Sequence, residues 1–227
     1  MTFDEWKPMA ERGMPEAQYN LGLMWSRGDG THRDDKEAVR WYRAAAEQGF
    51  AESQSNLGLM YGKGLGVERD DKAAVKWYRV AAEQGLAQAQ HNLAVMYGRG
   101  HGVAKDYQQA VNWFTLSAEQ GYAQAQYNLG LMFSRGEGVT PDHEEALKWY
   151  RLSAEQGIAG AQSNLGLMYE KGHGVERDYI EAHKWFNIAG INGNDTGRKN
   201  VDIVERKMTP GQIIVAASLA RKWMEKL

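Results

Sequence analysis

The sequence predicts an all-α protein, an α-solenoid of about six helix-turn-helix repeats with terminal capping helices. Three residue types recur with one period of 36 residues. An asparagine recurs at Asn20, Asn56, Asn92, Asn128 and Asn164, and Asn200 continues the series. A tryptophan recurs at Trp41, Trp77, Trp113, Trp149 and Trp185. The first glycine of a Gly-x-Gly loop recurs at Gly28, Gly64, Gly100, Gly136 and Gly172. Because unrelated residue types share one period, we expect every unit to fold in the same way.

The first segment of each unit has the period of an amphipathic helix, here called helix A. In the first unit Ala17, Leu21, Met24 and Trp25 fall at i, i+4, i+7 and i+8, which places them on one face. We expect helix A to stop at Gly28, since a residue that tolerates positive φ is wanted just after a helix.

The second segment, here called helix B, has the same property. Its apolar face is formed by Ala38, Trp41, Tyr42, Ala45 and Ala46. Helix B should end at Gly49. An aspartate suited to cap its N-terminus recurs at Asp34, Asp70, Asp106, Asp142 and Asp178. In the fourth unit a start at Thr140-Pro141 is an open alternative to Asp142.

Both ends of the chain have the character of caps, so we predict a single domain over residues 1–227. Residues 1–14 form an N-terminal capping helix, residues 15–194 five full repeats, and residues 195–227 a degenerate C-terminal capping repeat. Thr209-Pro210-Gly211-Gln212 is a capping-box sequence that starts the last helix. That helix should direct Ile213, Ala217, Ala220 and Met224 inward and show solvent a polar face of Arg221, Lys222, Glu225 and Lys226.

The repeated residues resemble the Sel1-like repeat family, relatives of the tetratricopeptide repeats. The resemblance rests on Ala-Gln-x-Asn-Leu-Gly-Leu-Met-Tyr, Lys/Arg-Gly-x-Gly-Val, Asp-x-x-x-Ala-x-x-Trp-Tyr and Ala-Glu-Gln-Gly, from about Pro15 to Met208. Departures are Thr31 in the first loop, Ala94 in place of a helix A glycine, and the loss of both loop glycines in the sixth unit.

The resemblance implies a right-handed superhelix whose concave side is lined by helix A. It also implies a scaffold or adaptor for protein complexes, often bacterial. Some cysteine-rich relatives have been linked to penicillin binding, which makes a hydrolase of the penicillin-binding or β-lactamase-like kind the alternative function. The sequence contains no cysteine, so it matches that branch poorly.

Composition bounds the partners and the compartment. A net charge of −2 gives no basic character, so we expect no nucleic-acid partner. No apolar run reaches the roughly 18 residues of a membrane-spanning helix, so we expect no membrane insertion. The first residues lack the features of a signal peptide, which predicts a cytoplasmic protein. A periplasmic or secreted location stays open if a signal peptide has been removed.

Sequence patterns for catalysis, metal binding and cofactor binding are weak, so we predict no enzyme, no metal and no cofactor. The six histidines form no i, i+4 pair on a helix. The Gly-x-Gly loops follow helices rather than strands, which indicates turns and not phosphate sites. No nucleophile, base and acid stand out as a set. The tryptophans, placed beside alanines at helical spacing, indicate core packing rather than a ligand cage.

Two polar columns on helix A have both a structural and a binding interpretation. The basic column consists of Arg27, Lys63, Arg99, Arg135, Lys171 and Lys207. Its cations either complement the helix dipole or meet carboxylates of a partner. The asparagine column consists of Asn20, Asn56, Asn92, Asn128 and Asn164, continued by Asn200. Its amides either bond the backbone of an adjacent turn or hold the backbone of a bound segment.

A third column on helix A is apolar. By analogy with tetratricopeptide repeats, the leucine column lies along the floor of the concave groove and consists of Leu23, Leu59, Val95, Leu131 and Leu167. We expect it to be flanked by Tyr19, Ser55, His91, Tyr127 and Ser163. An exposed apolar strip indicates a binding surface, unless superhelical curvature closes the groove over it. The three columns together predict a monomer that binds a protein or peptide segment with acidic and apolar residues interleaved.

Overall fold

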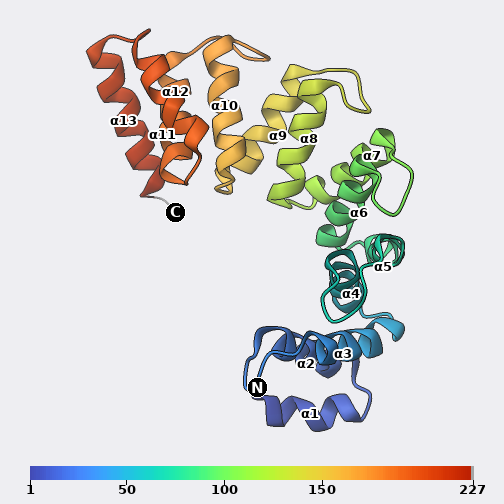
Figure 1. Ribbon diagram of the computed structural model, residues 1–227. Helices are drawn as coiled ribbons and strands as arrows, with labels where there is room; N and C mark the ends of the chain where they lie inside the picture. Colours follow the sequence, from blue (N-terminus) through green and yellow to red (C-terminus); the bar gives the residue numbers. More distant parts are fainter. Residues whose placement is uncertain (226–227) are drawn as a thin grey trace. The chain divides into compact units, whose positions relative to one another are not determined.

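The computed structural model describes residues 1–225, and within that range it contains thirteen helices and no strand (Figure 1). The predicted all-α repeat fold is thereby confirmed. The A helices are α2 (Pro15–Arg27), α4 (Ala51–Lys63), α6 (Ala87–Arg99), α8 (Ala123–Arg135), α10 (Ala159–Lys171) and α12 (Asp195–Glu205). The B helices are α3 (Asp35–Glu47), α5 (Asp71–Glu83), α7 (Tyr107–Glu119), α9 (His143–Glu155), α11 (Tyr179–Ile191) and α13 (Pro210–Met224), and α1 (Phe3–Glu11) precedes them. Within residues 1–225, every helix falls short of the length and apolarity of a membrane span.

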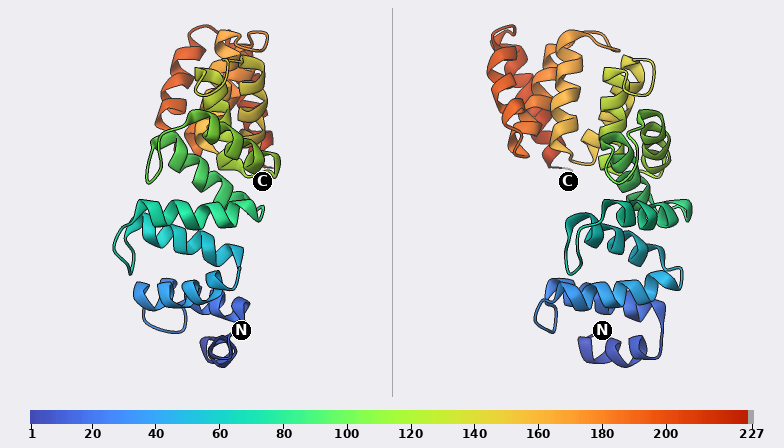
Figure 2. Two further views of the ribbon diagram at one scale, coloured as in Figure 1. Left: turned by 90° about the vertical axis from the view of Figure 1, so that its right-hand side faces the viewer. Right: turned by 45° about the vertical axis from the view of Figure 1, so that its right-hand side comes forward.

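The chain forms two compact units, Met1–Ser117 and a second that begins at Ala118. In each unit an A helix packs against the B helix of its own repeat and against the B helix before it, as α4 does with α5 and α3 (Figure 2). The boundary between the units falls inside α7 rather than between repeats. The assignment of the whole chain to a single domain stays a prediction.

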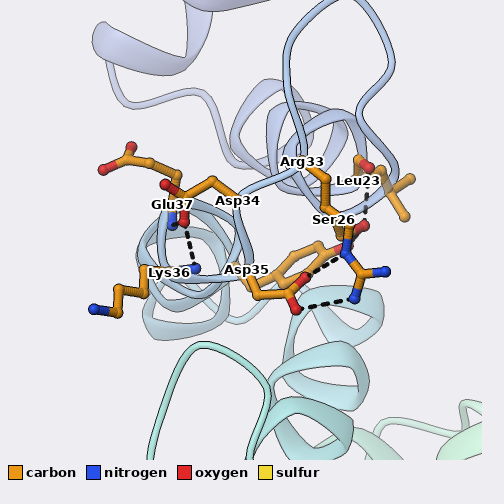
Figure 3. A network of polar contacts seen from close by, with 8 residues as sticks. Leu23, Ser26, Arg33, Asp34, Asp35, Lys36 and Glu37 are labelled. Atoms are coloured by element: carbon orange, nitrogen blue, oxygen red, sulfur yellow. Dashed lines mark hydrogen bonds and ion pairs between the residues drawn. The ribbon is translucent and has the colours of Figure 1, made fainter.

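The helix ends obey the local rules that the sequence suggested. Gly28 closes α2 with φ of 81°, which is in the left-handed region. Asp34 caps α3, where its Oδ1 accepts from the backbone N–H of Lys36 at 2.8 Å and of Glu37 at 3.2 Å (Figure 3). In the fourth repeat Asp142 is the cap of α9, which resolves the alternative start.

Close helix contact in the core depends on one small residue in helix A. A Cβ added at Gly58 would lie 2.9 Å from the ring of Tyr78 on α5, and one at Gly130 would lie 2.7 Å from the ring of Tyr150 on α9. The glycines therefore let an aromatic ring of helix B lie directly on the helix A backbone. Burial of these rings raises the pKa of Tyr78 and of Tyr150 to about 12.

A buried glutamine in helix A connects each repeat to the helix before it. Its Nε2 donates to a backbone carbonyl at 3.0–3.2 Å in five places: Gln18 to Ala10, Gln54 to Ala46, Gln90 to Ala82, Gln126 to Ala118, and Gln162 to Ala154. Four of these glutamines also accept, at 2.7–2.9 Å, from an amide at the end of their own helix B: Gln48, Gln84, Gln156 and Asn192. Each of these four glutamines thus holds three helices together.

The tryptophan column belongs to the core, as the sequence indicated. Trp77 and Trp113 of the first unit each pack on the apolar cluster of the preceding repeat. Trp185 is buried in a cluster of the second unit, and its indole N–H donates to Glu181 at 3.1 Å. A ring on one repeat thus fills a gap in its neighbour, so adjacent repeats support each other.

The C-terminal cap agrees with the sequence at its start and differs on its outer face. Thr209 and Gln212 form the predicted capping box of α13. Ala220 is buried and Ile213, Ala217 and Met224 are partly buried, while Arg221, Lys222 and Glu225 are exposed. Lys226 lies outside the described residues.

The outer face of α13 also carries apolar residues to which the sequence analysis assigned no place. Ile214, Val215 and Leu219 are exposed there, Ile214 to 71 %. The reason is that α13 docks through two small residues, Ala216 and Ala220. With that face turned inward, the larger apolar residues beside it remain in solvent.

Replacing Gln54 by Leu tests the glutamine link. The change leaves the Ala46 carbonyl and the Gln84 amide without this buried partner, so we expect the free energy of unfolding to fall by about 2–3 kcal/mol. Urea unfolding measures it. Gln88→Leu, at an exposed position of α6, is the matched control and should change little. Equal free energies for the two variants would show that the link does not stabilise the stack.

Replacing Tyr78 by Phe tests the buried ring through pH. The pKa of Tyr78 is about 12 when folded and about 10 when unfolded, so stability is fully present below pH 10 and is lost as pH rises through 12. The wild type should lose about 2 kcal/mol more than Tyr78→Phe across this window. Phe114 occupies the equivalent place in the next repeat, which indicates that Phe is tolerated. Parallel losses in chemical unfolding at pH 8, 10 and 12 would contradict this prediction.

Candidate functional site

The residues of the leucine column are neither fully exposed nor fully buried, which were the two arrangements that the sequence left open. Leu23, Leu59, Val95, Leu131 and Leu167 are all partly buried. Leu23 and Leu59 each contact the apolar cluster formed with the next repeat, and Leu131 does the same in the second unit. One side of each residue is therefore held by the core, while the other remains available to a ligand.

Among the residues expected beside the leucine column, the large rings are partly exposed and the small serines are buried. Tyr19, His91 and Tyr127 are partly buried, and their rings lie near aromatic rings on helix B, as Tyr127 does with Tyr150 at 6.2 Å between centroids. Burial lowers the pKa of His91. The serines at the same position, Ser55 and Ser163, are each only 3 % exposed. The expectation that they flank the groove as surface residues is wrong, because their short side chains are enclosed.

The basic column is exposed, and five of its members end an A helix. Arg27, Lys63, Arg99, Arg135 and Lys171 are each the last residue before a helix-closing glycine. That position suits the dipole interpretation. Within residues 1–225, Arg135 forms a long ion pair with Glu137 at 3.8 Å, and the other four form none, so they are also available to a partner.

The sixth member of the basic column departs from the prediction. Helix α12 ends at Glu205, so Lys207 lies beyond the helix rather than in its last turn. Its Nζ forms an ion pair with Glu170 at 2.7 Å, and this contact raises the pKa of Lys207. Glu170 therefore neutralises Lys207, so this member of the basic column already has an anionic partner within the protein.

The asparagine column is partly buried in every repeat, and its contacts vary. Asn20 donates to the Glu16 carbonyl of its own helix at 2.8 Å. Asn92 lies 3.2 Å from the Nδ1 of His91. Asn56 and Asn164 lie near the tyrosine hydroxyl of the preceding repeat, where each lowers in part the pKa that burial raises, that of Tyr42 and of Tyr150 respectively. None of these four contacts reaches the backbone of an adjacent turn.

The amide that does bond a neighbouring backbone is the glutamine two residues earlier, to which the sequence reasoning gave no role. The signal was present, since Gln18, Gln54, Gln90, Gln126 and Gln162 recur with the same period as the asparagines. What the sequence does not contain is the identity of the carbonyl that each glutamine meets.

In the second unit the three columns meet at a cavity of about 190 Å³. Five of the predicted residues line it: Leu131, Arg135, Asn164, Leu167 and Lys171. The structure adds Ser134, Tyr150, Met168 and His173. Apolar walls, hydroxyl and amide groups, and two cations thus surround one small space. The cations give it a positive potential, as shown by Arg135, which lowers the pKa of Tyr150 against the larger rise caused by burial.

One further pair of residues was missed by reasoning from spacing. The rings of His143 and His173, which belong to successive repeats, stack with centroids 4.7 Å apart. Within residues 1–225 there is no group of three or more histidine, cysteine, aspartate or glutamate side chains that could hold a metal ion. The histidine pair therefore lacks the further ligands of a metal centre.

Comparison with known proteins places these features in a family. The family model for the Sel1 repeat matches residues 15–50, 51–86, 87–122, 123–158 and 159–194. The chain is similar to a Sel1 repeat protein from Oxalobacter formigenes of known structure, with 36% identity, coverage of 94% of this chain and 84% of that chain, and a TM-score of 0.79. The comparison with curated proteins gives no match.

Two further solved structures are similar to the chain. The antigen c5321 of uropathogenic Escherichia coli is 32% identical, with coverage of 99% of this chain and 64% of that chain and a TM-score of 0.45. Immunity protein Pa5087 from Pseudomonas aeruginosa is 22% identical, with coverage of 93% and 80% and a TM-score of 0.52, and it shows the fold alone. Since the five matched repeats span most of the sequence, the chain belongs to the Sel1 repeat family.

Proposed function

We propose that this protein is a non-enzymatic scaffold that binds a segment of a partner protein along the helix A surface. Sel1 repeat proteins are generally protein-interaction scaffolds. The observation that carries the proposal is that helix A of each full repeat contributes one residue to the leucine column and one to the basic column. A partly buried leucine column runs beside a basic column of which four members have no ion pair within residues 1–225.

The leucine column supplies apolar burial. Each leucine keeps part of its side chain accessible, and covering that part is favourable by about 25 cal/mol per Å². Because the core already holds the other side, the leucines lose little conformational freedom when a partner binds. A partner residue placed every repeat along the surface therefore meets a fixed apolar contact.

The basic column supplies charge selection. Arg27, Arg99 and Arg135 can grip a carboxylate with two parallel hydrogen bonds, while Lys63 and Lys171 act as point charges. The preferred partner therefore has acidic and apolar residues interleaved, and its association rate should fall with added salt. The asparagines add paired donors and acceptors that suit a peptide backbone.

The hydrolase alternative has no comparable support. It depended on a cysteine-rich branch of the family, and this sequence contains no cysteine. The hydroxyl residues at the cavity of the second unit, Ser134 and Tyr150, lie close to each other and do not form a serine, base and acid series. The positive, partly apolar cavity suits binding better than hydrolysis.

A charge-reversal variant, with Lys63, Arg99 and Arg135 replaced by Glu, separates the binding and dipole interpretations. We expect it to lose binding to acidic–apolar peptides and to keep its helicity, since all three side chains are exposed. Fluorescence anisotropy with a peptide library at low and high salt measures binding, and circular dichroism measures helicity and melting.

The matched control replaces Lys36, Lys72 and Lys76 on the exposed sides of α3 and α5 by Glu, which makes the same change in net charge. This control should bind like the wild type. The dipole interpretation alone expects the opposite balance, a loss of about 0.3–1 kcal/mol for each cation with binding unchanged. That result would remove the basic column from the proposed function.

A further inference from the structure

Two of the repeat junctions carry one set of five polar residues that the other junctions lack. At the junction of the first and second repeats the set is Ser26, Arg27, Tyr42, Asn56 and Lys63. At the junction of the fourth and fifth repeats it is Ser134, Arg135, Tyr150, Asn164 and Lys171. Each set lies within one of the two compact units.

Packing of the fold does not require this set. At the second junction Gly62 stands in place of the serine, and in the sequence of the third Gly98 and Phe114 stand in place of the serine and the tyrosine. At the fifth junction Glu170 replaces the serine and neutralises Lys207. Repeats with glycine and phenylalanine at these positions form the same helix pairs, so the hydroxyl groups need another explanation.

In the second unit the set surrounds the cavity of about 190 Å³. Tyr150 is only 2 % exposed, and its burial raises its pKa, while Ser134 and Asn164 lie close enough to its hydroxyl to lower that pKa in part. These three residues line the cavity, and Arg135 and Lys171, which line it too, stand at the exposed ends of α8 and α10. The ion pair of Arg135 with Glu137 is long and solvent-exposed, so an incoming anion displaces it at little cost.

The first unit has the same five residue types at the corresponding positions. Ser26 donates to the Leu23 carbonyl at 2.9 Å, as Figure 3 shows, and its Oγ lies 3.3 Å from the Tyr42 hydroxyl. Burial raises the pKa of Tyr42, and Asn56 lies close enough to the same hydroxyl to lower that pKa in part. Arg27 and Lys63 end the two A helices of this junction and have no ion pair within residues 1–225. Since the single Ser26 hydrogen goes to the Leu23 carbonyl, the groups left for an incoming anion at this junction are the Asn56 amide and the cations Arg27 and Lys63.

We infer that these two junctions are carboxylate subsites, each of which takes one aspartate or glutamate side chain of the bound partner. The inference rests on the proposed function and adds where along the surface the acidic residues sit. A carboxylate is acceptor-only and negative, which matches a site of donors and cations. The leucines beside each junction contact the apolar residues next to that side chain.

The carboxylate comes from a side chain rather than from a chain end. One partner chain has a single C-terminal carboxylate but can carry many acidic side chains. The same five residues occur twice in this protein, so a ligand group that can itself occur twice is the better match.

The test uses a synthetic peptide of alternating Asp and Leu residues with acetylated and amidated ends, and a second peptide with Asn in place of Asp. The variant is Ser134→Gly with Tyr150→Phe, which installs residues that other repeats already carry. Calorimetric titration should show about tenfold weaker binding of the Asp peptide to this variant, the loss expected when hydrogen bonds to a charged group are removed. Binding of the Asn peptide should be weak to the wild type and the variant alike.

Tyr78→Phe, at the junction that lacks the serine, is the matched control and should bind the Asp peptide like the wild type. The serine and tyrosine changes could leave the affinity intact while reversal of the basic column abolishes it. In that case the proposal of carboxylate subsites is wrong, and the proposal of binding along the helix A surface is kept. If only a peptide with a free C-terminus binds, the side-chain assignment is wrong. If the wild type binds no Asp peptide, both the proposed subsites and the proposed preference for acidic partners are wrong.

Discussion

The stack depends on a backbone carbonyl at the end of one helix B and the glutamine amide that reaches it from the next helix A. That carbonyl already accepts from the N–H of the glycine that follows helix B, as Ala46 does from Gly49, and the glutamine of the next repeat uses its remaining acceptor capacity. The glutamine bonds it and accepts from a second amide of its own repeat, so one side chain sets the spacing of three helices. The glycine contact under the aromatic ring and the tryptophan packing both require that spacing.

The helices and their ends could be predicted because local residues determine them. Asp34 and its equivalents cap helix B through their own neighbours, and Gly28 closes helix A through its own backbone angle. The outer face of α13 could not be read in the same way. Which side of that helix turns inward depends on where Ala216 and Ala220 find room on α11, and a helical pattern alone does not contain that information.

The candidate site was predicted in its columns but not in its detail. The period placed Leu131, Arg135 and Asn164 on one surface, and the structure brings them to one cavity. The buried Tyr150 was assigned to the core only, since a residue of helix B was not expected to reach the helix A surface of the next repeat. Variation between repeats proved as informative as their similarity. A position that is serine at two junctions and glycine or glutamate at others is free of the packing constraint, and such positions are where repeats of one fold can acquire different tasks.

The glutamine link also determines how an array of this kind can change in length. Each repeat offers a carbonyl to the repeat after it and takes one from the repeat before it, so a whole unit can be gained or lost with every buried amide still paired. Loss of part of a unit leaves a donor or an acceptor stranded. In the sixth unit the guanidinium of Arg198 takes the Gly190 carbonyl in place of a glutamine. Evolution can therefore lengthen or shorten the surface in whole repeats.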